Sequence, residues 1–275
     1  MKNDGWENVT ASRPCPVCGR KTWCRVSATS GAVNCMRIAA EHAVANGGWI
    51  HYPADRIKPE PRPTVAAHPL PAYEPPDFDA DRWWQAVRRV ITWDKMEAWA
   101  TRLGLPIETL DVMGGCHLGT MLAFPMYDGT GKVCGIRTRN RDGSKRAVTG
   151  SRAGVFLPTF HDPSAKPVIC EGPTDAAAAF ALGFYPIGRP SCTGCERHVV
   201  DTCRRLGIER VTLCADDDGP GIAGARKLGE VLQAAKLSVR MVAPCGHKDL
   251  RDWFKAGATR DMVDAQWSQA KWRYS

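Results

Sequence analysis

Carboxylates stand directly after two apolar segments of the sequence. Glu171 follows residues 168–170, and Asp216 and Asp218 follow residues 211–214. The apolar segments are typical of buried parallel strands, whose carboxyl ends meet at one edge of a sheet, so the three carboxylates are expected to lie together. Crowded carboxylates repel one another unless a divalent cation lies between them. The pattern therefore predicts a two-metal site for Mg²⁺ or Mn²⁺, of the kind that phosphoryl-transfer enzymes use.

Other residues of the same two segments have expected roles. Asp175 lies one helical turn beyond Glu171 and can point to the same region. Thr174 is expected to cap the helix that carries Asp175. Asp217 faces away from its two neighbours in an extended chain, and we expect it to be a helix cap or a solvated turn residue.

A third charged cluster follows the apolar segment 239–243. Lys248, Asp249 and Asp252 belong to it, and they are expected to close the site from a further strand end.

A cationic segment precedes the acidic residues. It contains one acid, Asp142, and seven basic residues: Lys132, Arg137, Arg139, Arg141, Lys145, Arg146 and Arg152. Apolar residues around Asp128-Gly129-Thr130-Gly131 predict a hairpin that carries these charges. They are either a solvated face or a surface for an anionic partner.

Four cysteines near the amino terminus predict a structural zinc site: Cys15, Cys18, Cys24 and Cys35. The Cys-x-x-Cys pair lets two thiolates face one point. The second pair is less regular, so His42 or His51 could replace one cysteine, and Cys24 is the least secure ligand. A second Cys-x-x-Cys, Cys192 to Cys195, is interpreted as small apolar filler between a strand and a helix, with a second zinc site as the alternative.

Composition bounds the protein class. The 275 residues carry a net charge of +8, and 44% are hydrophobic. The sequence shows neither a signal peptide nor an apolar run long enough to span a membrane, so a cytoplasmic protein is expected. In that compartment the twelve cysteines favour reduced thiols and metal ligation over disulfides.

Alternating strand and helix patterns predict a multi-domain α/β protein with a mostly parallel, Rossmann-like sheet. The expected parts are a zinc ribbon (1–52), a Pro-rich linker (53–78), a helical subdomain (79–118), a basic strand-rich α+β subdomain (119–165), the parallel-sheet catalytic domain (166–258) and a C-terminal helix (259–275).

Three motifs in order resemble the Toprim domain: Glu171-Gly172, Asp216-x-Asp218-x-x-Gly221 and Lys248-Asp249. Toprim domains occur in bacterial-type primases, topoisomerases and some nucleases. The zinc knuckle, the linker and the basic segment add a resemblance to DnaG-type DNA primases and to the primase halves of phage and mobile-element primase-helicases.

The resemblance implies residue roles. Glu171, Asp216 and Asp218 would be catalytic and would hold the metals. The residues implied to bind metal, nucleotide or template around them are Asp175, Asp249, Asp252, Lys248, Arg137, Arg139, Lys145 and Arg146. The sequence departs from the family in using four cysteines where three and a histidine are common, and in carrying Arg251 where another Asp is frequent, for which Asp252 can substitute.

The resemblance predicts an enzyme that synthesises short RNA primers on single-stranded DNA from ribonucleoside triphosphates, that is, a DNA-directed RNA polymerase active in DNA replication. The sequence has no P-loop motif, so a replicative helicase would be a separate partner. Two alternatives stay open: a Toprim nuclease that uses the same carboxylates, and a non-catalytic, zinc-dependent adaptor that binds single-stranded DNA.

Overall fold

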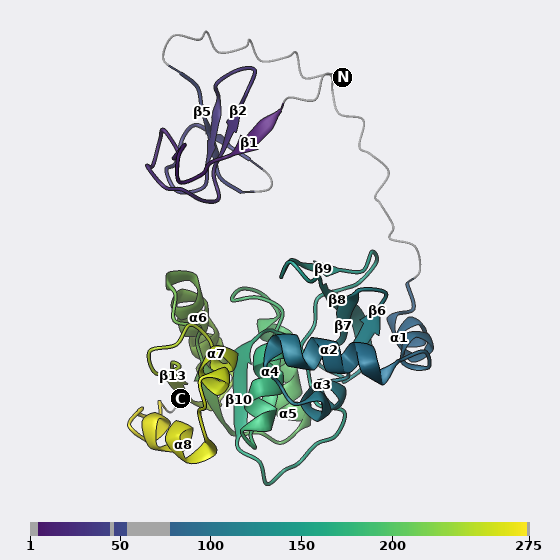
Figure 1. The fold of residues 1–275 in the computed structure, drawn as a ribbon. Helices are drawn as coiled ribbons and strands as arrows, with labels where there is room; N and C mark the ends of the chain where they lie inside the picture. The colour runs from purple at the N-terminus through teal and green to yellow at the C-terminus, as the bar shows by residue number, and fades with distance from the viewer. Residues whose placement is uncertain (1–4, 45–46, 54–77, 274–275) are drawn as a thin grey trace, which may run out of the picture. The chain divides into compact units, whose positions relative to one another are not determined.

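The chain forms two compact units, Met1–Tyr73 and Glu74–Ser275 (Figure 1). The structure, a computed structural model, describes residues 5–44, 47–53 and 78–273. The predicted Pro-rich linker therefore lies almost entirely outside the described residues. Within the described part of the chain, no helix has the length and the apolar character needed to cross a membrane.

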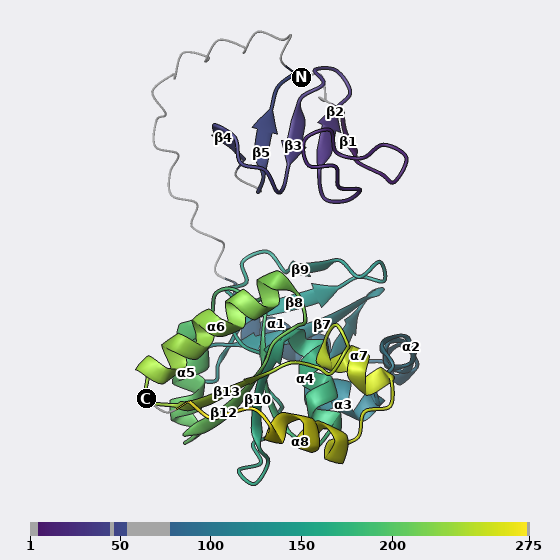
Figure 2. The ribbon, with the colours of Figure 1, turned by 90° about the vertical axis from the view of Figure 1, so that its left-hand side faces the viewer.

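The first unit is an antiparallel sheet with the strand order β1-β2-β3-β5-β4 (Figure 2). Its strands are β1 (Trp6–Asn8), β2 (Arg25–Ser27), β3 (Val33–Cys35), β4 (His42–Ala43) and β5 (Trp49–His51). Its buried core consists of two valines and three cysteines: Val9, Val33, Cys15, Cys24 and Cys35. So small an apolar core does not stabilise a fold by itself, and units of this size depend on a metal or another crosslink.

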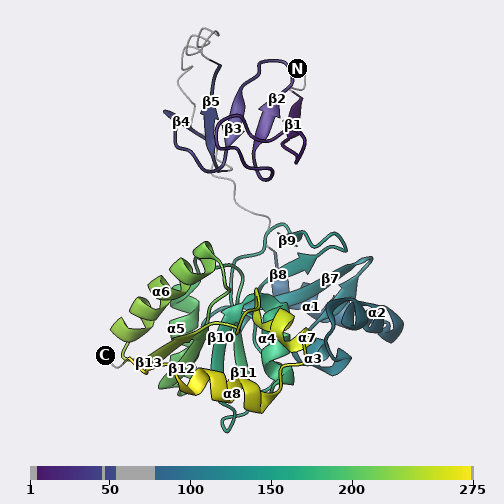
Figure 3. The ribbon, with the colours of Figure 1, turned by 60° about the vertical axis from the view of Figure 1, so that its left-hand side comes forward.

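A four-stranded parallel sheet lies at the centre of the second unit, with the strand order β11-β10-β12-β13 (Figure 3). The strands are β10 (Pro167–Glu171), β11 (Tyr185–Arg189), β12 (Arg210–Cys214) and β13 (Ser238–Val242). The helices around them are α4 (Gly172–Ala181), α5 (Glu196–Arg205), α6 (Gly219–Ala234), α7 (Leu250–Lys255) and α8 (Arg260–Ser268).

Both faces of this sheet are buried. Val168 and Cys170 share one core with residues of α4, α7 and α8, whereas Ile169 between them packs with residues of α5 and α6. This alternation follows from the twofold repeat of a strand, and it explains why the strands are apolar throughout. The predicted α/β fold with a parallel sheet is confirmed.

An antiparallel sheet with the order β6-β7-β8-β9 precedes the parallel one. Its strands are β6 (Cys116–Leu118), β7 (Met121–Tyr127), β8 (Val133–Arg139) and β9 (Lys145–Ala147), and the helices before it are α1 (Ala80–Arg88), α2 (Trp93–Leu103) and α3 (Ile107–Val112). Val155 pairs with Tyr127 of β7, and its neighbour Phe156 pairs with Gly188 of β11. The segment 155–156 thus joins the two sheets. The hairpin predicted around residues 128–131 is β7–β8, but most of the basic residues lie on the next hairpin, β8–β9, which is called the basic hairpin below.

The predicted C-terminal helix over 259–275 is too long. Helix α8 ends at Ser268, and Arg273 instead pairs with Val239 at the edge of β13 through two backbone hydrogen bonds of 3.0 and 2.7 Å. The Arg240 guanidinium lies 4.8 Å from the centroid of the Trp272 ring. Pairing at the sheet edge and this cation–π contact together favour the extended chain over further helix.

The predicted cap at Thr174 is also wrong. Helix α4 begins at Gly172, so Thr174 lies inside its first turn. Pro173 accounts for the early start, because its fixed φ suits the first helical positions, where no backbone donor is needed. Asp175 nevertheless stays one turn beyond Glu171, as expected.

Candidate functional site

The four amino-terminal cysteines converge on one point. The Sγ atoms of Cys15, Cys18, Cys24 and Cys35 all lie within 4.8 Å of one another. The Sγ atoms of Cys18 and Cys24 are 3.7 Å apart, close to the edge of about 3.8 Å that a tetrahedron with Zn–S bonds of about 2.3 Å requires. The donor set and its spacing fit zinc, and Cys24, the least secure ligand in the sequence, belongs to the group.

Backbone donors support these sulfurs. The Met36 amide donates to Cys24 Sγ at 3.5 Å, and the Ile38 amide donates to Cys35 Sγ at 3.4 Å. The Arg20 amide lowers the pKa of the Cys18 thiol to about 6, while burial raises the pKa of Cys24 to about 12.

Neither alternative histidine ligand joins the cluster. The His51 ring instead contacts the Ile38 carbonyl, with Nε2 at 3.0 Å from the oxygen. The His42 ring lies edge-on to Tyr52. Among the described residues, the metal-binding group of the first unit is therefore made of the four cysteines alone.

The predicted catalytic carboxylates follow two adjacent strands of the parallel sheet. Glu171 is the last residue of β10, and Asp216 and Asp218 lie in the loop between β12 and α6. Asp218 caps α6, its Oδ1 accepting a hydrogen bond of 2.7 Å from the Gly221 amide. A Cβ at residue 221 would lie 2.8 Å from the Asp216 carbonyl oxygen, so this turn requires glycine. The cap is Asp218, whereas Asp217 is exposed and donates its amide to the Lys248 carbonyl.

The charges of this edge act on Asp216. Burial, together with the charges of Glu171, Asp249 and Asp218, raises the pKa of Asp216 to about 7, against the opposing charge of Lys145. A carboxyl with such a pKa binds a proton at neutral pH unless a cation takes its place. The site therefore has a deficit of positive charge.

The three carboxylates do not converge as the cysteines do. In the described part of the chain, the thiols are the only group of three or more ligand atoms within 4.8 Å of one another. The oxygen donors nevertheless suit Mg²⁺, which keeps several water ligands and binds through one or two carboxylates. The fit of these three carboxylates to Mg²⁺ thus rests on their oxygen donors and on their negative charge.

A second pair of carboxylates lies deeper. Asp175 and Asp249 are 5% and 8% exposed. Burial and, second to it, the charge of Asp249 raise the pKa of Asp175 to about 8. Asp175 Oδ1 accepts the Arg251 amide at 3.0 Å, and Asp249 caps α7. Burial and the charge of Arg251 lower the pKa of Arg139, whereas the charges of Asp175 and Asp249 raise it. These two carboxylates are therefore tied to basic residues inside the protein.

The register of the hairpin divides the predicted basic residues. Arg139 pairs with Lys145, and Arg137 pairs with Ala147, so Arg137, Arg139 and Lys145 share one face of the sheet. Arg146 pairs with Thr138 and belongs to the other face, where it is exposed.

Lys145 lies at the carboxylates. A Cβ built on Gly172 would lie 3.8 Å from Lys145 Nζ. Gly172 has a φ of +81°, which few side chains tolerate, and the ammonium lies at ordinary contact distance from this position, next to Glu171. The charge of Lys145 lowers the pKa of Asp216.

The third predicted cluster contributes less than expected. The Lys248 side chain is exposed, and it is the backbone carbonyl oxygen of Lys248 that accepts a hydrogen bond from the Asp217 amide. Asp252 is exposed too, and its Oδ2 lies 3.8 Å from His247 Nδ1. Asp249 is the member of this cluster whose charge raises the pKa of Asp216 and of Asp175.

Sequence reasoning missed Arg189. It ends β11 directly beside Glu171 in the parallel register and is 4% exposed. The sequence offered one signal, a basic residue at the end of a short strand, but the position of that strand next to β10 could not be deduced from it. Arg189, Glu171, Asp216 and Cys192 line a cavity of about 20 Å³.

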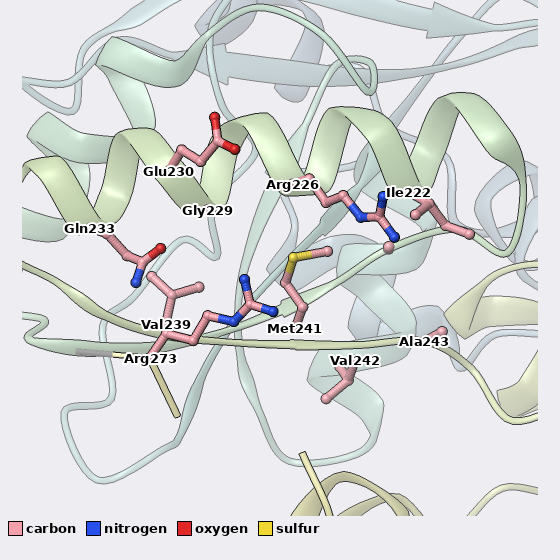
Figure 4. A pocket seen from close by; sticks show the side chains of 11 residues that line it. Ile222, Arg226, Gly229, Glu230, Gln233, Val239, Met241, Val242, Ala243 and Arg273 are labelled. Atoms are coloured by element: carbon pink, nitrogen blue, oxygen red, sulfur yellow. The ribbon is translucent and has the colours of Figure 1, made fainter. Parts of the chain in front are cut away.

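A larger groove lies between α6 and β13 and contains none of the predicted site residues. Its volume is about 420 Å³. Arg226 lies above Met241 and Arg273 extends toward Met241 from the side, whereas the Glu230 carboxylate points away (Figure 4).

Comparisons with known proteins place the fold. No family model matches the sequence, and no curated protein matches it significantly. Solved structures do match. The DnaG catalytic core is 13% identical, with 70% of this chain and 78% of that chain covered and a TM-score of 0.53. The DnaG catalytic domain bound to single-stranded DNA is 13% identical over 65% and 72%, with a TM-score of 0.53. The zinc-binding and RNA polymerase domains of the Aquifex aeolicus primase are 14% identical over 70% and 60%, with a TM-score of 0.54.

These matches define a class. Over about two thirds of its length, the chain has the fold of DnaG-type primase catalytic cores. The resemblance expected from the Toprim motifs is confirmed at the level of the fold. At such identities the likeness does not assign the reaction, which rests on the site.

Proposed function

We propose that this protein is a DNA primase that synthesises short RNA primers on single-stranded DNA by metal-dependent nucleotidyl transfer. The observation that carries the proposal is the set of carboxylates at the ends of β10 and β12, faced by Lys145 of the basic hairpin, on a DnaG-like fold.

The roles follow from charge. Glu171, Asp216 and Asp218 would hold Mg²⁺ or Mn²⁺, which when bound supplies charge neutralisation to the attacking and leaving oxygens. Lys145 would bind the triphosphate of the incoming ribonucleotide, because its ammonium lies beside Gly172 at the same edge. Arg137 and Arg139 share its face and would contact the template or the triphosphate.

The inner acids would have a different task. Asp175 accepts the amide of Arg251, and Asp249 caps α7, so both hold the start of that helix against α4. Such groups fix the position of the outer carboxylates, and nucleotidyl transfer depends mostly on position and on charge neutralisation.

The first unit would bring the protein to its template. Trp23, next to the proposed zinc ligand Cys24, is 77% exposed, and Arg25, on the other side of Cys24, is exposed as well. An exposed aromatic ring among basic residues suits stacking on unpaired bases. We further propose that a replicative helicase is a partner of this protein.

A synthesis assay tests the proposal. The zinc-loaded chain is incubated with single-stranded DNA, labelled ribonucleoside triphosphates and Mg²⁺ or Mn²⁺. We expect short labelled RNA products, and we expect Asp216→Asn to abolish them. Asp217→Asn is the matched control, because it makes the same change one residue away in an exposed carboxylate.

Each other outcome points to a rival function. Shortened DNA without labelled RNA would identify a nuclease that uses the same carboxylates. DNA binding without synthesis or cleavage under either metal would identify a non-catalytic adaptor. Synthesis that survives Asp216→Asn would show that the active site lies elsewhere.

A further inference from the structure

Arg189 is a buried cation whose hydrogen bonding is incomplete. Its Nη2 donates to the Gly194 carbonyl at 3.1 Å and lies 3.7 Å from Glu196 Oε1. Its Nε is buried and has no hydrogen-bond partner in the described part of the chain. A buried donor without a partner costs free energy, so its retention calls for an explanation.

The contacts of Arg189 hold its guanidinium in place from one side. Glu196 begins α5, accepts the Gly194 amide at 3.2 Å and lies 4.0 Å from Lys227 Nζ of α6. The carboxylate thus links two helices and the loop before α5 to the arginine. These contacts account for Nη2 of Arg189, but they leave its Nε without a hydrogen-bond acceptor.

The other side of Arg189 faces the proposed metal site. Arg189 and Glu171 are direct neighbours across the parallel strands β11 and β10. Both residues line the cavity of about 20 Å³, together with Asp216. A space of this size holds one water molecule when two or more polar groups surround it.

We propose that Arg189 is a positioning residue for Glu171, and that it donates from Nε to a water molecule in this cavity that also binds the Glu171 carboxylate. The inference rests on the proposed function, since it concerns how the metal-binding Glu171 is held. Outer groups of this kind orient a carboxylate ligand, and their loss typically weakens metal binding about 10- to 100-fold.

The test is a double-mutant cycle on the zinc-loaded full chain. The measured quantity is the affinity for Mn²⁺, with Mn²⁺ alone as the probe. The electron paramagnetic resonance signal of free Mn²⁺ reports how much is bound. Removal of Arg189 alone would change the charge beside the metal. We therefore choose the double variant Arg189→Met/Glu196→Gln, which removes both members of the ion pair and leaves the net charge unchanged.

The expected result is a dissociation constant about 10-fold higher for the double variant. In a Glu171→Gln background, the same double change should weaken binding by less than about twofold, because the group that it positions is already altered. The matched control is Arg240→Met, which removes a partly buried arginine bonded to Thr212 and the Trp267 carbonyl. We expect unchanged Mn²⁺ affinity for this control.

Two outcomes would overturn the inference. One is unchanged affinity in the folded double variant, and the other is equal weakening in both backgrounds. If the double variant does not fold, Arg189→Lys decides, because lysine keeps the charge but lacks the Nε–H donor; it should bind Mn²⁺ about threefold more weakly, and only when Glu171 is present. Primer synthesis is a separate readout, so failure of the proposed function and failure of this inference are distinguishable.

Discussion

The two candidate metal sites of this chain differ in how their ligands are arranged. In the first unit, four sulfur atoms lie within 4.8 Å of one another. At the edge of the parallel sheet, three carboxylates are spread over two strand ends, and one of them, Asp218, is exposed and occupied as a helix cap. The thiols form a closed site, whereas the carboxylates form an open one.

Under the proposed function, the closed site would hold a metal that stabilises the fold, and the open site would hold a metal that takes part in the reaction. The cysteines replace an apolar core, so their metal is part of folding. The carboxylates belong to a unit whose core is complete on both faces of the sheet. A complete core can offset the repulsion among these carboxylates, and under the proposed function their wider spacing would leave positions for substrate and water.

Loss of a zinc ligand should give the largest effect. Cys35→Ser should abolish zinc binding and unfold the first unit, since a structural zinc contributes about 10 kcal/mol to modules of this size. The second unit should melt as before, because it is a separate compact unit. Zinc content and hydrogen exchange measure the two effects, with Cys245→Ser, an exposed cysteine, as the control. Unfolding of both units would contradict the separation.

Lys145→Gln tests the open site. The change should lower primer synthesis about 10-fold, because a charged hydrogen bond of roughly 1.5 kcal/mol to a phosphate is lost. Arg146→Gln makes a comparable change on the other face of the hairpin, and we expect less than about a twofold effect. Steady-state rates at saturating Mg²⁺ compare the two variants. Equal losses would show that the face of the hairpin does not matter.

The pH dependence of stability should distinguish the open site from the closed one. The native pKa values of Asp216 and Asp175, about 7 and about 8, exceed the unfolded value of 3.8. Between these values the native state binds more protons than the unfolded state, so stability should fall as pH rises from about 4 to 8.

This fall is measured as the melting temperature of the second unit in zinc-loaded protein without Mg²⁺. Asp175→Asn should flatten the profile, since asparagine can still accept the Arg251 amide but does not ionise. Added Mg²⁺ should raise stability most at the alkaline end. A melting temperature that rises from pH 4 to 8 would show that the pKa values of Asp216 and Asp175 are not raised in the native state.

Gly172→Ala should give the smallest effect. Its φ of +81° strains any side chain by about 1–2 kcal/mol, while the nearest atoms, 3.8 and 3.9 Å from the new Cβ, leave space for it. Melting of the second unit should therefore fall by about 4 °C, with synthesis kept. Gly219→Ala, where a Cβ meets nothing within 4 Å, is the control. A loss of synthesis without a loss of stability would mean that Gly172 contacts substrate.

The sequence predicted those residues whose positions follow from local pattern. Glu171 and Asp216 could be placed because an apolar strand ends just before each of them. The Cys15 and Cys18 pair could be placed because its spacing alone brings two sulfurs together.

What the sequence could not predict depends on pairing between distant segments. Arg189 became part of the site because β11 lies beside β10, an order that no residue of either strand encodes. The hairpin register pairs Arg139 with Lys145, and this pairing puts Lys145 instead of Arg146 on the face of Arg137 and Arg139. Arg273 ends at a sheet edge instead of in a helix because β13 is left unpaired on that side.

One measurement tests the central claim that the two sites do separate work. Zinc content and RNA primer synthesis are determined together for the wild-type chain, Asp216→Asn and Asp217→Asn. We predict that all three retain one zinc per chain and that Asp216→Asn alone loses synthesis, by roughly 1000-fold. Full synthesis by zinc-loaded Asp216→Asn would contradict the account.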